Sequence, residues 1–159
     1  MNLVQQVFDE LSVHGLKLAT AESCTGGMVA AAITDIAGSS AIFDRGFVTY
    51  SNAAKVEQLG VAYDLITKFG AVSEEEAMAM AQGALLNSAA DLAISITGVA
   101  GPSGGSDSKP VGLVHFALAT RDETISKVQN FGPLEREVIR QKAVNAALQM
   151  VLDQLDSEP

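Results

Sequence analysis

Apolar residues recur with helical spacing in three stretches of the chain, and they form short continuous runs in others. Residues 2–14 have a helical pattern, and Gly15 follows at the position of a left-handed cap. Residues 25–36 predict a second helix that stops before Gly38, and residues 134–155 predict a long last helix. The expected core positions of the first helix are Leu3, Val4, Val7, Phe8 and Leu11, and those of the last are Val138, Ala143, Ala146, Met150 and Val151.

Polar residues mark the starts of two further helices. Ser73 followed by Glu76 has the spacing of a capping box, which predicts a helix beginning there. The acidic run 74–76 would form the first turn of that helix, where solvated carboxylates are favoured by the helix dipole. Asn52 is the expected N-cap of a short helix that carries Lys55.

The continuous apolar runs predict strands. The expected strands are residues 16–22, 43–50, 91–97, 111–119 and 124–131. The last two are expected to form an antiparallel hairpin, and the segment 98–110, rich in Gly, Ser and Pro, to form a loop. Because helices and strands interleave, we predict an α/β fold: a single-domain three-layer sandwich with a mixed, mostly parallel sheet and helices on both faces.

Composition narrows the class of protein. A length of 159 residues and a hydrophobic fraction of 48% suit one globular domain over residues 1–159. The formal net charge of −9 disfavours a polyanion-binding surface, so no nucleic-acid partner is expected. No signal peptide precedes Leu3, and no apolar run approaches the ~20 residues of a membrane span. We expect a cytoplasmic protein without a membrane partner, and a homodimer is left open.

Three predicted strands end in residues that carry chemistry. Ser23, Tyr50 and Thr97 stand at the carboxyl ends of the first three strands. Ligands of open α/β sheets collect beyond these ends, so the three segments predict one site at a common edge.

Ser23 stands where a strand turns into a helix and is a candidate nucleophile, which would need a base. Lys55 is the better base, because His14 and His115 stand at a helix end and inside a strand. A desolvated lysine has a lowered pKa and can accept the serine proton. Tyr50 could orient the lysine or relay the proton. The alternative is structural: a capping serine, a solvated lysine and a tyrosine that ends a strand.

Cys24 is a rival nucleophile, since a helix N-terminus favours thiolate, although a lone cysteine among small residues is more often a buried hydrophobe. Being the only cysteine, it excludes an intrachain disulfide. No grouping of Cys, His, Asp or Glu has the spacing of metal ligands, so we expect no metal and no cofactor.

Two glycine-containing segments could bind anions through backbone N–H groups. The first is Thr25, Gly26 and Gly27, which we expect to hold an oxyanion because these residues follow Ser23 in the chain. The second is the loop 97–105, expected to hold a phosphate together with Arg140; its binding positions are Thr97, Gly98, Gly101, Gly104 and Gly105. Arg136 and Arg140 lie one helical turn apart and could clamp a phosphate together. The alternatives are an ordinary connecting loop and, for the two arginines, pairing with surface carboxylates.

Six motifs cover most of the chain and together resemble the CinA C-terminal domain family. They are AESCTGG (21–27), ITDIAGSS (33–40), RGFVTYSNAAK (45–55), GAVSEE (70–75), SITGVAGPSGG (95–105) and KPVGLVHFA (109–117). The resemblance implies an amidohydrolase that converts nicotinamide mononucleotide to nicotinate mononucleotide and ammonia. It also implies that Ser23 is the nucleophile, with Lys55 and Tyr50 activating it. A non-catalytic nucleotide-sensing module and a Cys24-dependent hydrolase remain the alternative functions.

Overall fold

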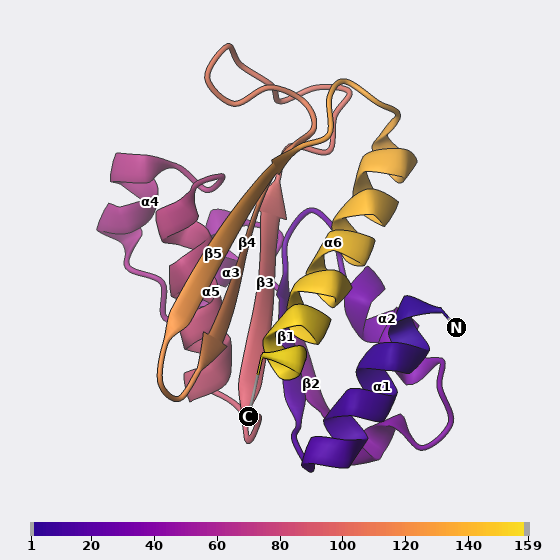
Figure 1. The fold of residues 1–159 in the computed structure, drawn as a ribbon. Helices are drawn as coiled ribbons and strands as arrows, with labels where there is room; N and C mark the ends of the chain where they lie inside the picture. Colours follow the sequence, from indigo (N-terminus) through magenta and orange to yellow (C-terminus); the bar gives the residue numbers. More distant parts are fainter. Residues whose placement is uncertain (1, 158–159) are drawn as a thin grey trace.

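The computed structural model describes residues 2–157 as a five-stranded sheet with helices on both faces (Figure 1). In chain order the elements are α1 (Leu3–His14), β1 (Leu18–Glu22), α2 (Met28–Thr34), the 3₁₀ turn η1 (Ser39–Ala41), β2 (Phe43–Val48), α3 (Asn52–Leu59), α4 (Tyr63–Phe69), α5 (Glu74–Leu86), β3 (Leu92–Gly98), β4 (Leu113–Thr120), β5 (Thr124–Asn130) and α6 (Arg136–Asp156).

The strands lie in the order β2-β1-β3-β4-β5. β1 pairs in parallel with β2 and β3, whereas β3 with β4 and β4 with β5 are antiparallel. Among the described strands β4 alone runs against the others, so the predicted mixed sheet is confirmed. Glu22 pairs with Val48 on one side and with Ile96 on the other. This register brings the carboxyl ends of β1, β2 and β3 to one edge.

Helices α1, α2 and α6 cover one face of the sheet, and α3, α4 and α5 cover the other (Figure 1). On the α6 face, large side chains form the main core, among them Leu11, Phe116 and Leu148. On the α5 face, small residues allow close packing: Ala77 and Ala81 lie against alanines of β4. The helices on this face therefore pack closely against the sheet, and this packing holds α3 and α5 in place.

Several helix boundaries differ from the prediction. Asn52 is not the N-cap of α3; Ser51, extended at φ −92° and ψ 160°, caps the helix by accepting a hydrogen bond from the Ala54 N–H at 3.0 Å. Both residues are good caps, so their order alone could not decide between them. α2 begins only at Met28, because the two glycines before it have positive φ and form a turn. Val138 is 39% exposed and lies outside the core. The short elements α4 and η1 were not expected.

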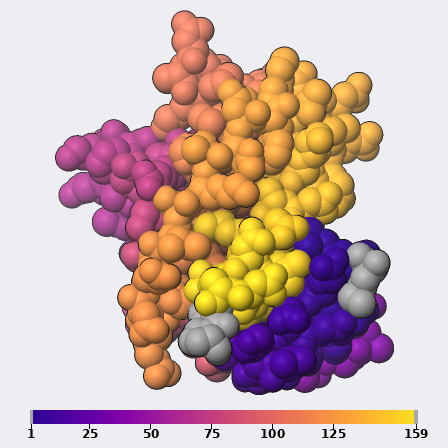
Figure 2. Space-filling view, in the orientation of Figure 1, coloured from indigo at the N-terminus to yellow at the C-terminus, as the bar shows by residue number. Residues whose placement is uncertain are grey.

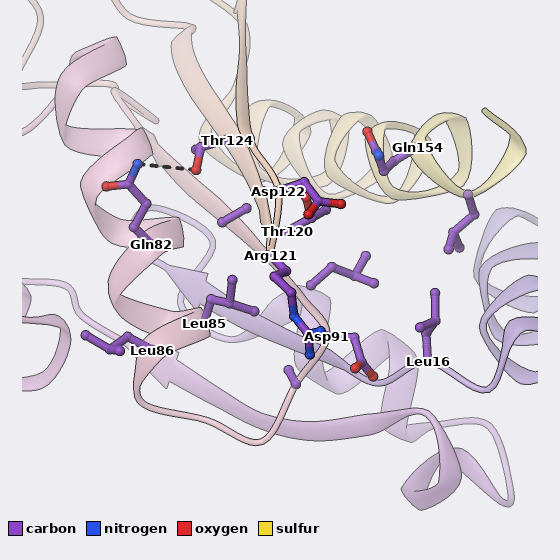
Figure 3. A pocket seen from close by; sticks show the side chains of 14 residues that line it. Leu16, Gln82, Leu85, Leu86, Asp91, Thr120, Arg121, Asp122, Thr124 and Gln154 are labelled. Atoms are coloured by element: carbon purple, nitrogen blue, oxygen red, sulfur yellow. Dashed lines mark hydrogen bonds between the residues drawn. The ribbon is translucent and has the colours of Figure 1, made fainter. Parts of the chain in front are cut away.

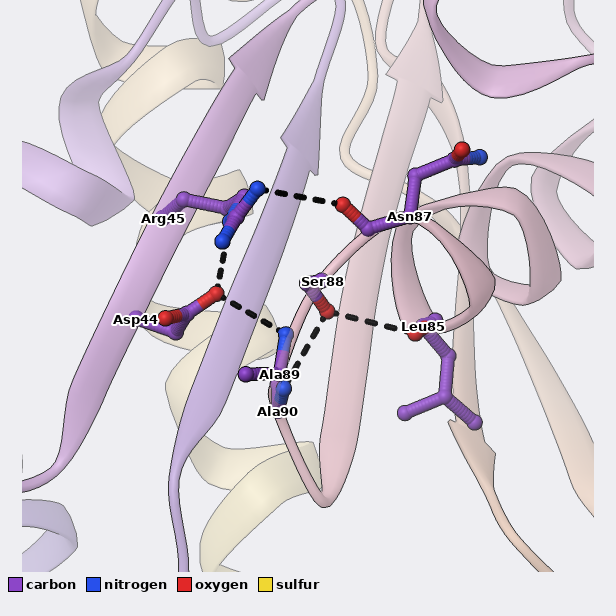
Figure 4. A network of polar contacts seen from close by, with 7 residues as sticks. All are labelled: Asp44, Arg45, Leu85, Asn87, Ser88, Ala89 and Ala90. Carbon is purple, nitrogen blue, oxygen red and sulfur yellow. Dashed lines mark hydrogen bonds and ion pairs between the residues drawn. The ribbon is translucent and has the colours of Figure 1, made fainter.

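A polar network ties the edge strand β2 to the turn between α5 and β3 (Figure 4). Asp44 accepts from Arg45 Nε at 2.6 Å and from the Ala89 N–H at 3.1 Å, and Arg45 also donates to the Asn87 carbonyl at 3.4 Å. The hydrogen bond from the Arg45 guanidinium lowers the pKa of the Asp44 carboxyl. The network lies away from the carboxyl ends of the strands, and its role is to anchor the edge of the sheet.

Candidate active site

A pocket of about 330 Å³ lies beyond the carboxyl ends of β1 and β3. The lining residues are Ser23, Cys24, Tyr50, Asn52, Lys55, Ala71, Val72, Thr97, Gly98, Val99, Ala100, Gly101, Ser103, Gly104 and Arg136. The loop between β3 and β4 projects beyond this edge and forms the upper end of the molecule (Figures 1 and 2). The pocket is therefore built from four chain segments, those that follow β1, β2, α4 and β3, together with the first turn of α6.

Ser23 and Lys55 meet inside this pocket. Ser23 follows β1 directly, and its N–H donates to the Ile96 carbonyl at 3.0 Å, which fixes its backbone against β3. Lys55 lies at the end of the first turn of α3 and is only 1% exposed. Its Nζ donates to Ser23 Oγ at 3.0 Å and to the Tyr50 carbonyl at 3.4 Å.

Burial lowers the pKa of Lys55, and the negative charge of Glu76 opposes that shift, as does Cys24 where its thiol is ionised. A lysine in these surroundings carries more neutral amine near neutral pH than an exposed one. A neutral Nζ within hydrogen-bond distance of a hydroxyl can accept its proton. The arrangement is therefore suited to activating Ser23 as a nucleophile.

Glu76 corrects the expectation of a solvated acidic turn. Its backbone N–H donates to Ser73 Oγ at 3.1 Å, as the cap requires, but its side chain is fully buried. Among residues 2–157 neither carboxylate oxygen of Glu76 has a hydrogen-bond partner. Burial raises the pKa of Glu76 to about 7, against the opposing effect of Lys55. The carboxylate thus does not close the capping box and lies in the protein interior.

Cys24 is 5% exposed, and burial raises the pKa of its thiol to about 11. The thiol is protonated at neutral pH, whereas a cysteine nucleophile needs the thiolate. The geometry therefore favours the serine over the cysteine.

The turn after Ser23 is held rigidly from both sides. Glu22 accepts hydrogen bonds from Thr25 Oγ1 at 2.7 Å and from two N–H groups of α2, those of Val29 at 2.9 Å and Ala30 at 3.1 Å. Arg140 donates to the carbonyls of Cys24 at 3.0 Å and Thr25 at 3.3 Å. Within the described residues the N–H group of Thr25 donates no hydrogen bond, whereas that of Cys24 is directed at the sulfur of its own side chain; Thr25 is fully buried.

Arg136 reaches the pocket from the first turn of α6. It donates to the Gly101 carbonyl at 2.7 Å and to the Tyr50 hydroxyl at 3.1 Å. The ring of Tyr50 is 62% exposed, and its hydroxyl meets Arg136 rather than Lys55. Tyr50 therefore contacts the lysine only through its carbonyl.

The structure brings together part of the predicted set. Ser23, Tyr50, Lys55, Thr97, Gly98, Gly101 and Gly104 line the pocket, whereas Thr25, Gly26, Gly27, Gly105 and Arg140 are not among its lining residues. Sequence reasoning missed Ala71 and Val72, which have no chemically distinctive side chain. The hydrogen bond from Thr97 Oγ1 to the Ala71 carbonyl, at 2.6 Å, holds these two residues at the pocket. Of the two arginines that could clamp a phosphate, Arg136 lines the pocket and Arg140 does not.

A second hollow, of about 780 Å³, lies at the opposite edge of the sheet (Figure 3). Leu85, Leu86, Asp91 and Arg121 are among the residues that line it. Within residues 2–157 no group of three or more His, Cys, Asp or Glu side chains could hold a metal ion. Over the same residues, no helix has both the length and the apolar character needed to cross a membrane.

Fold and site together define an α/β protein with a buried Ser–Lys pair at the carboxyl edge of a mixed sheet. The model of the CinA C-terminal domain matches residues 1–155, and the chain belongs to that family.

Curated relatives share its sequence over most of its length. The nicotinamide-nucleotide amidohydrolase PncC of Escherichia coli K12 is 52% identical over 155 residues, which cover 97% of this chain and 93% of that protein. PncC of Enterobacter agglomerans is 51% identical over 89% of this chain and 87% of its own. A putative competence-damage inducible protein of Caldicellulosiruptor saccharolyticus is 49% identical over 94% of this chain but only 36% of its own length.

Solved structures have the same fold. The competence/damage inducible protein CihA of Agrobacterium tumefaciens superposes with a TM-score of 0.94 at 48% identity, covering 98% of this chain and 94% of that one. The competence damage-inducible protein A of Klebsiella pneumoniae subsp. pneumoniae MGH 78578 also gives 0.94, at 39% identity, covering 99% and 97%. The predicted α/β class is therefore confirmed.

Proposed function

We propose that this protein is a nicotinamide-nucleotide amidohydrolase that converts nicotinamide mononucleotide to nicotinate mononucleotide and ammonia. The near-full-length relationship to the PncC amidohydrolases supports this substrate. The observation that carries the chemistry is the buried Lys55 Nζ at 3.0 Å from Ser23 Oγ, inside a pocket. The cytoplasm is the compartment we propose for this enzyme, in keeping with a chain that has a single cysteine.

In the proposed reaction Ser23 Oγ attacks the carboxamide carbon while Lys55 Nζ takes the hydroxyl proton. The carbonyl oxygen becomes an oxyanion, and we assign its stabilisation to backbone N–H groups of the turn that follows Ser23. When the tetrahedral intermediate collapses, the C–N bond breaks and Lys55 returns the proton to the departing ammonia. Water then attacks the acyl-enzyme with Lys55 again as base, releasing the nicotinate product and restoring the Ser23 hydroxyl.

The phosphate of the substrate is assigned to the other side of the pocket. The loop residues Ala100, Ser103 and Gly104 line it, and their backbone N–H groups donate no hydrogen bond within residues 2–157. Arg136 adds a guanidinium at the same end, whereas Arg140 is engaged with the turn after Ser23. We therefore assign the phosphate to this loop with Arg136 in place of Arg140.

Ammonia release by the purified protein tests the proposal. Nicotinamide mononucleotide should yield one ammonia and one nicotinate mononucleotide, and the same preparation of Ser23→Ala should yield neither above background. Free nicotinamide and nicotinamide riboside serve as matched substrates that lack part of the ligand. Tight binding of the mononucleotide without ammonia release would contradict the proposal and support the sensing module instead.

A further inference from the structure

Two carboxylates are buried near the Ser23–Lys55 pair, and they differ in what holds them. Glu22, 1% exposed, accepts three hydrogen bonds and thereby fixes the start of α2. Glu76 is fully buried, yet neither of its oxygens has a hydrogen-bond partner within residues 2–157. A buried carboxylate without partners is costly, and such groups are rare unless they have a function.

The position of Glu76 on α5 places it opposite Lys55. Glu76, Met80 and Gly83 follow helical spacing and are all buried. Met80 packs in one apolar cluster with Leu59 of α3, and a Cβ on Gly83 would collide with the Leu59 carbonyl. The face of α5 that carries Glu76 is therefore pressed against α3, on which Lys55 stands one turn before Leu59.

The charges of the two groups act on each other. Glu76 raises the pKa of Lys55 against the effect of burial, and Lys55 lowers the pKa of Glu76 against the same effect. The two do not form a direct ion pair among the described residues, and two of the three ammonium protons of Lys55 already point to Ser23 and Tyr50. The interaction is thus electrostatic, between two buried side chains whose charges are weakly screened.

Few other titratable groups face Lys55. From the turn after β1 only the Cys24 thiol acts on it, and this group is protonated at neutral pH. Glu22, on β1, is turned to the N-terminus of α2. From α5, Glu75 instead acts on His115 of β4. Glu74, at the start of the same helix, is bonded to Ser126 and also acts on His115. Arg136 of α6 is engaged with Tyr50 and Gly101.

We propose that Glu76 is a positioning residue that acts through Lys55 and sets the pH at which the lysine can accept the proton of Ser23. The inference rests on the proposed role of Lys55 as base. With Glu76 ionised, the pair is held as ammonium and carboxylate, and the lysine cannot take a proton. With the charge of Glu76 removed, the largest effect that opposes the desolvation of Lys55 is lost, so its neutral form appears at lower pH.

The kinetic test is the pH profile of kcat/KM for nicotinamide mononucleotide in Glu76→Gln. The acid limb should move to lower pH, so that kcat/KM at a fixed pH on that limb is about threefold to tenfold above wild type. Glu76→Asp keeps the charge and should keep the limb near its wild-type position. Glu75→Gln is the matched control, since it removes a carboxylate on the same helical turn whose charge does not act on Lys55. If the Gln variant folds poorly, Glu76→Met, of similar length, should give the same shift.

The second readout needs no turnover. Lysine labelled with ¹³C at Cε reports the titration of Lys55 by NMR, with Lys55→Met to assign its signal. Glu76→Gln should lower the titration midpoint, and Glu75→Gln should not. An unchanged midpoint overturns the inference even if Ser23 and Lys55 prove essential. A midpoint that moves while the acid limb stays in place overturns the role of Glu76 in catalysis. Failure of the proposed function would appear separately: the wild type would release no ammonia from nicotinamide mononucleotide, while the NMR midpoints would still report whether Glu76 acts on Lys55.

Discussion

At the amino ends of β1 and β3 lies a hollow of about 780 Å³, whereas the pocket at their carboxyl ends measures about 330 Å³. Leucines and ordinary surface residues make up much of the larger one (Figure 3). The smaller pocket contains the buried Lys55, which is hydrogen-bonded to Ser23, and the carboxylate of Glu76 is buried nearby. Size and apolar lining alone would therefore select the opposite end of the sheet from the one we propose as the active site.

The difference follows from how the two edges are built. At the carboxyl edge, the chain leaves the parallel strands at neighbouring points. Helices begin there, and the N–H groups of their first turns have no partner within the helix. At the amino edge the lining comes from helix ends and the β4–β5 turn, and it lacks a reactive pair with a perturbed lysine. Desolvated polar groups lower the stability of a protein, and they cluster at functional sites.

The largest effect is expected from Ser23→Ala. Removing the proposed nucleophile should lower kcat for nicotinamide mononucleotide by at least about a thousandfold, because acyl transfer to the enzyme is lost. The fold should change little, since the lost hydrogen bond is worth about 1 kcal/mol. Ammonia release and a thermal melt measure both quantities. Turnover near wild type would show that the smaller pocket does not act through its serine.

Lys55→Arg should be nearly as damaging, because arginine remains protonated and cannot accept the serine proton. In the proposed mechanism the neutral form of Lys55 is the active one, and burial lowers the pKa of this lysine. Activity should therefore rise with pH through the lowered pKa and be lost on the acid side. A pH profile of kcat/KM measures this limb, and a flat profile would argue against a lysine base.

Arg136→Ala should act on phosphate recognition. Loss of a charged hydrogen-bond donor should cost about 2–4 kcal/mol in kcat/KM for the mononucleotide, mostly through KM, and little for nicotinamide riboside. Arg140→Ala is the matched control on the same helix face. It frees the turn after Ser23, so kcat should fall for both substrates alike. Equal losses for the two substrates in Arg136→Ala would remove Arg136 from the phosphate site.

Much of the carboxyl edge of the sheet could be predicted from the sequence. The strand ends at Ser23 and Thr97 and the helix carrying Lys55 were recognised, since apolar runs and cap residues mark them. The two arginines were harder: they lie one turn apart on α6, and only the packing of that helix decides which faces the pocket. The turn at Gly26 was assigned to a helix because small residues are compatible with both structures.

Glu76 shows a different kind of failure. The spacing Ser73 to Glu76 is that of a capping box, and the backbone half of that box is present. The direction of the carboxylate depends on which face of α5 is buried. That helix is rich in alanine, so it has no clear polar face from which the inward direction could be inferred. Charged side chains are also rarely buried, so the general preferences of residue types predict an exposed carboxylate at this position.

The smallest effect is expected at the larger hollow. Leu86, 84% exposed, and Arg121 line it at the amino edge of the sheet, away from Ser23 and Lys55. Leu86→Ala and Arg121→Ala should each leave kcat/KM for the mononucleotide within about twofold, since surface substitutions away from a site usually cost less than 0.5 kcal/mol. The same ammonia assay measures this, with a melt to verify folding. A tenfold loss of kcat/KM in either variant would show that the larger hollow affects turnover. The size of a pocket would then be a better guide to function than its buried polar groups.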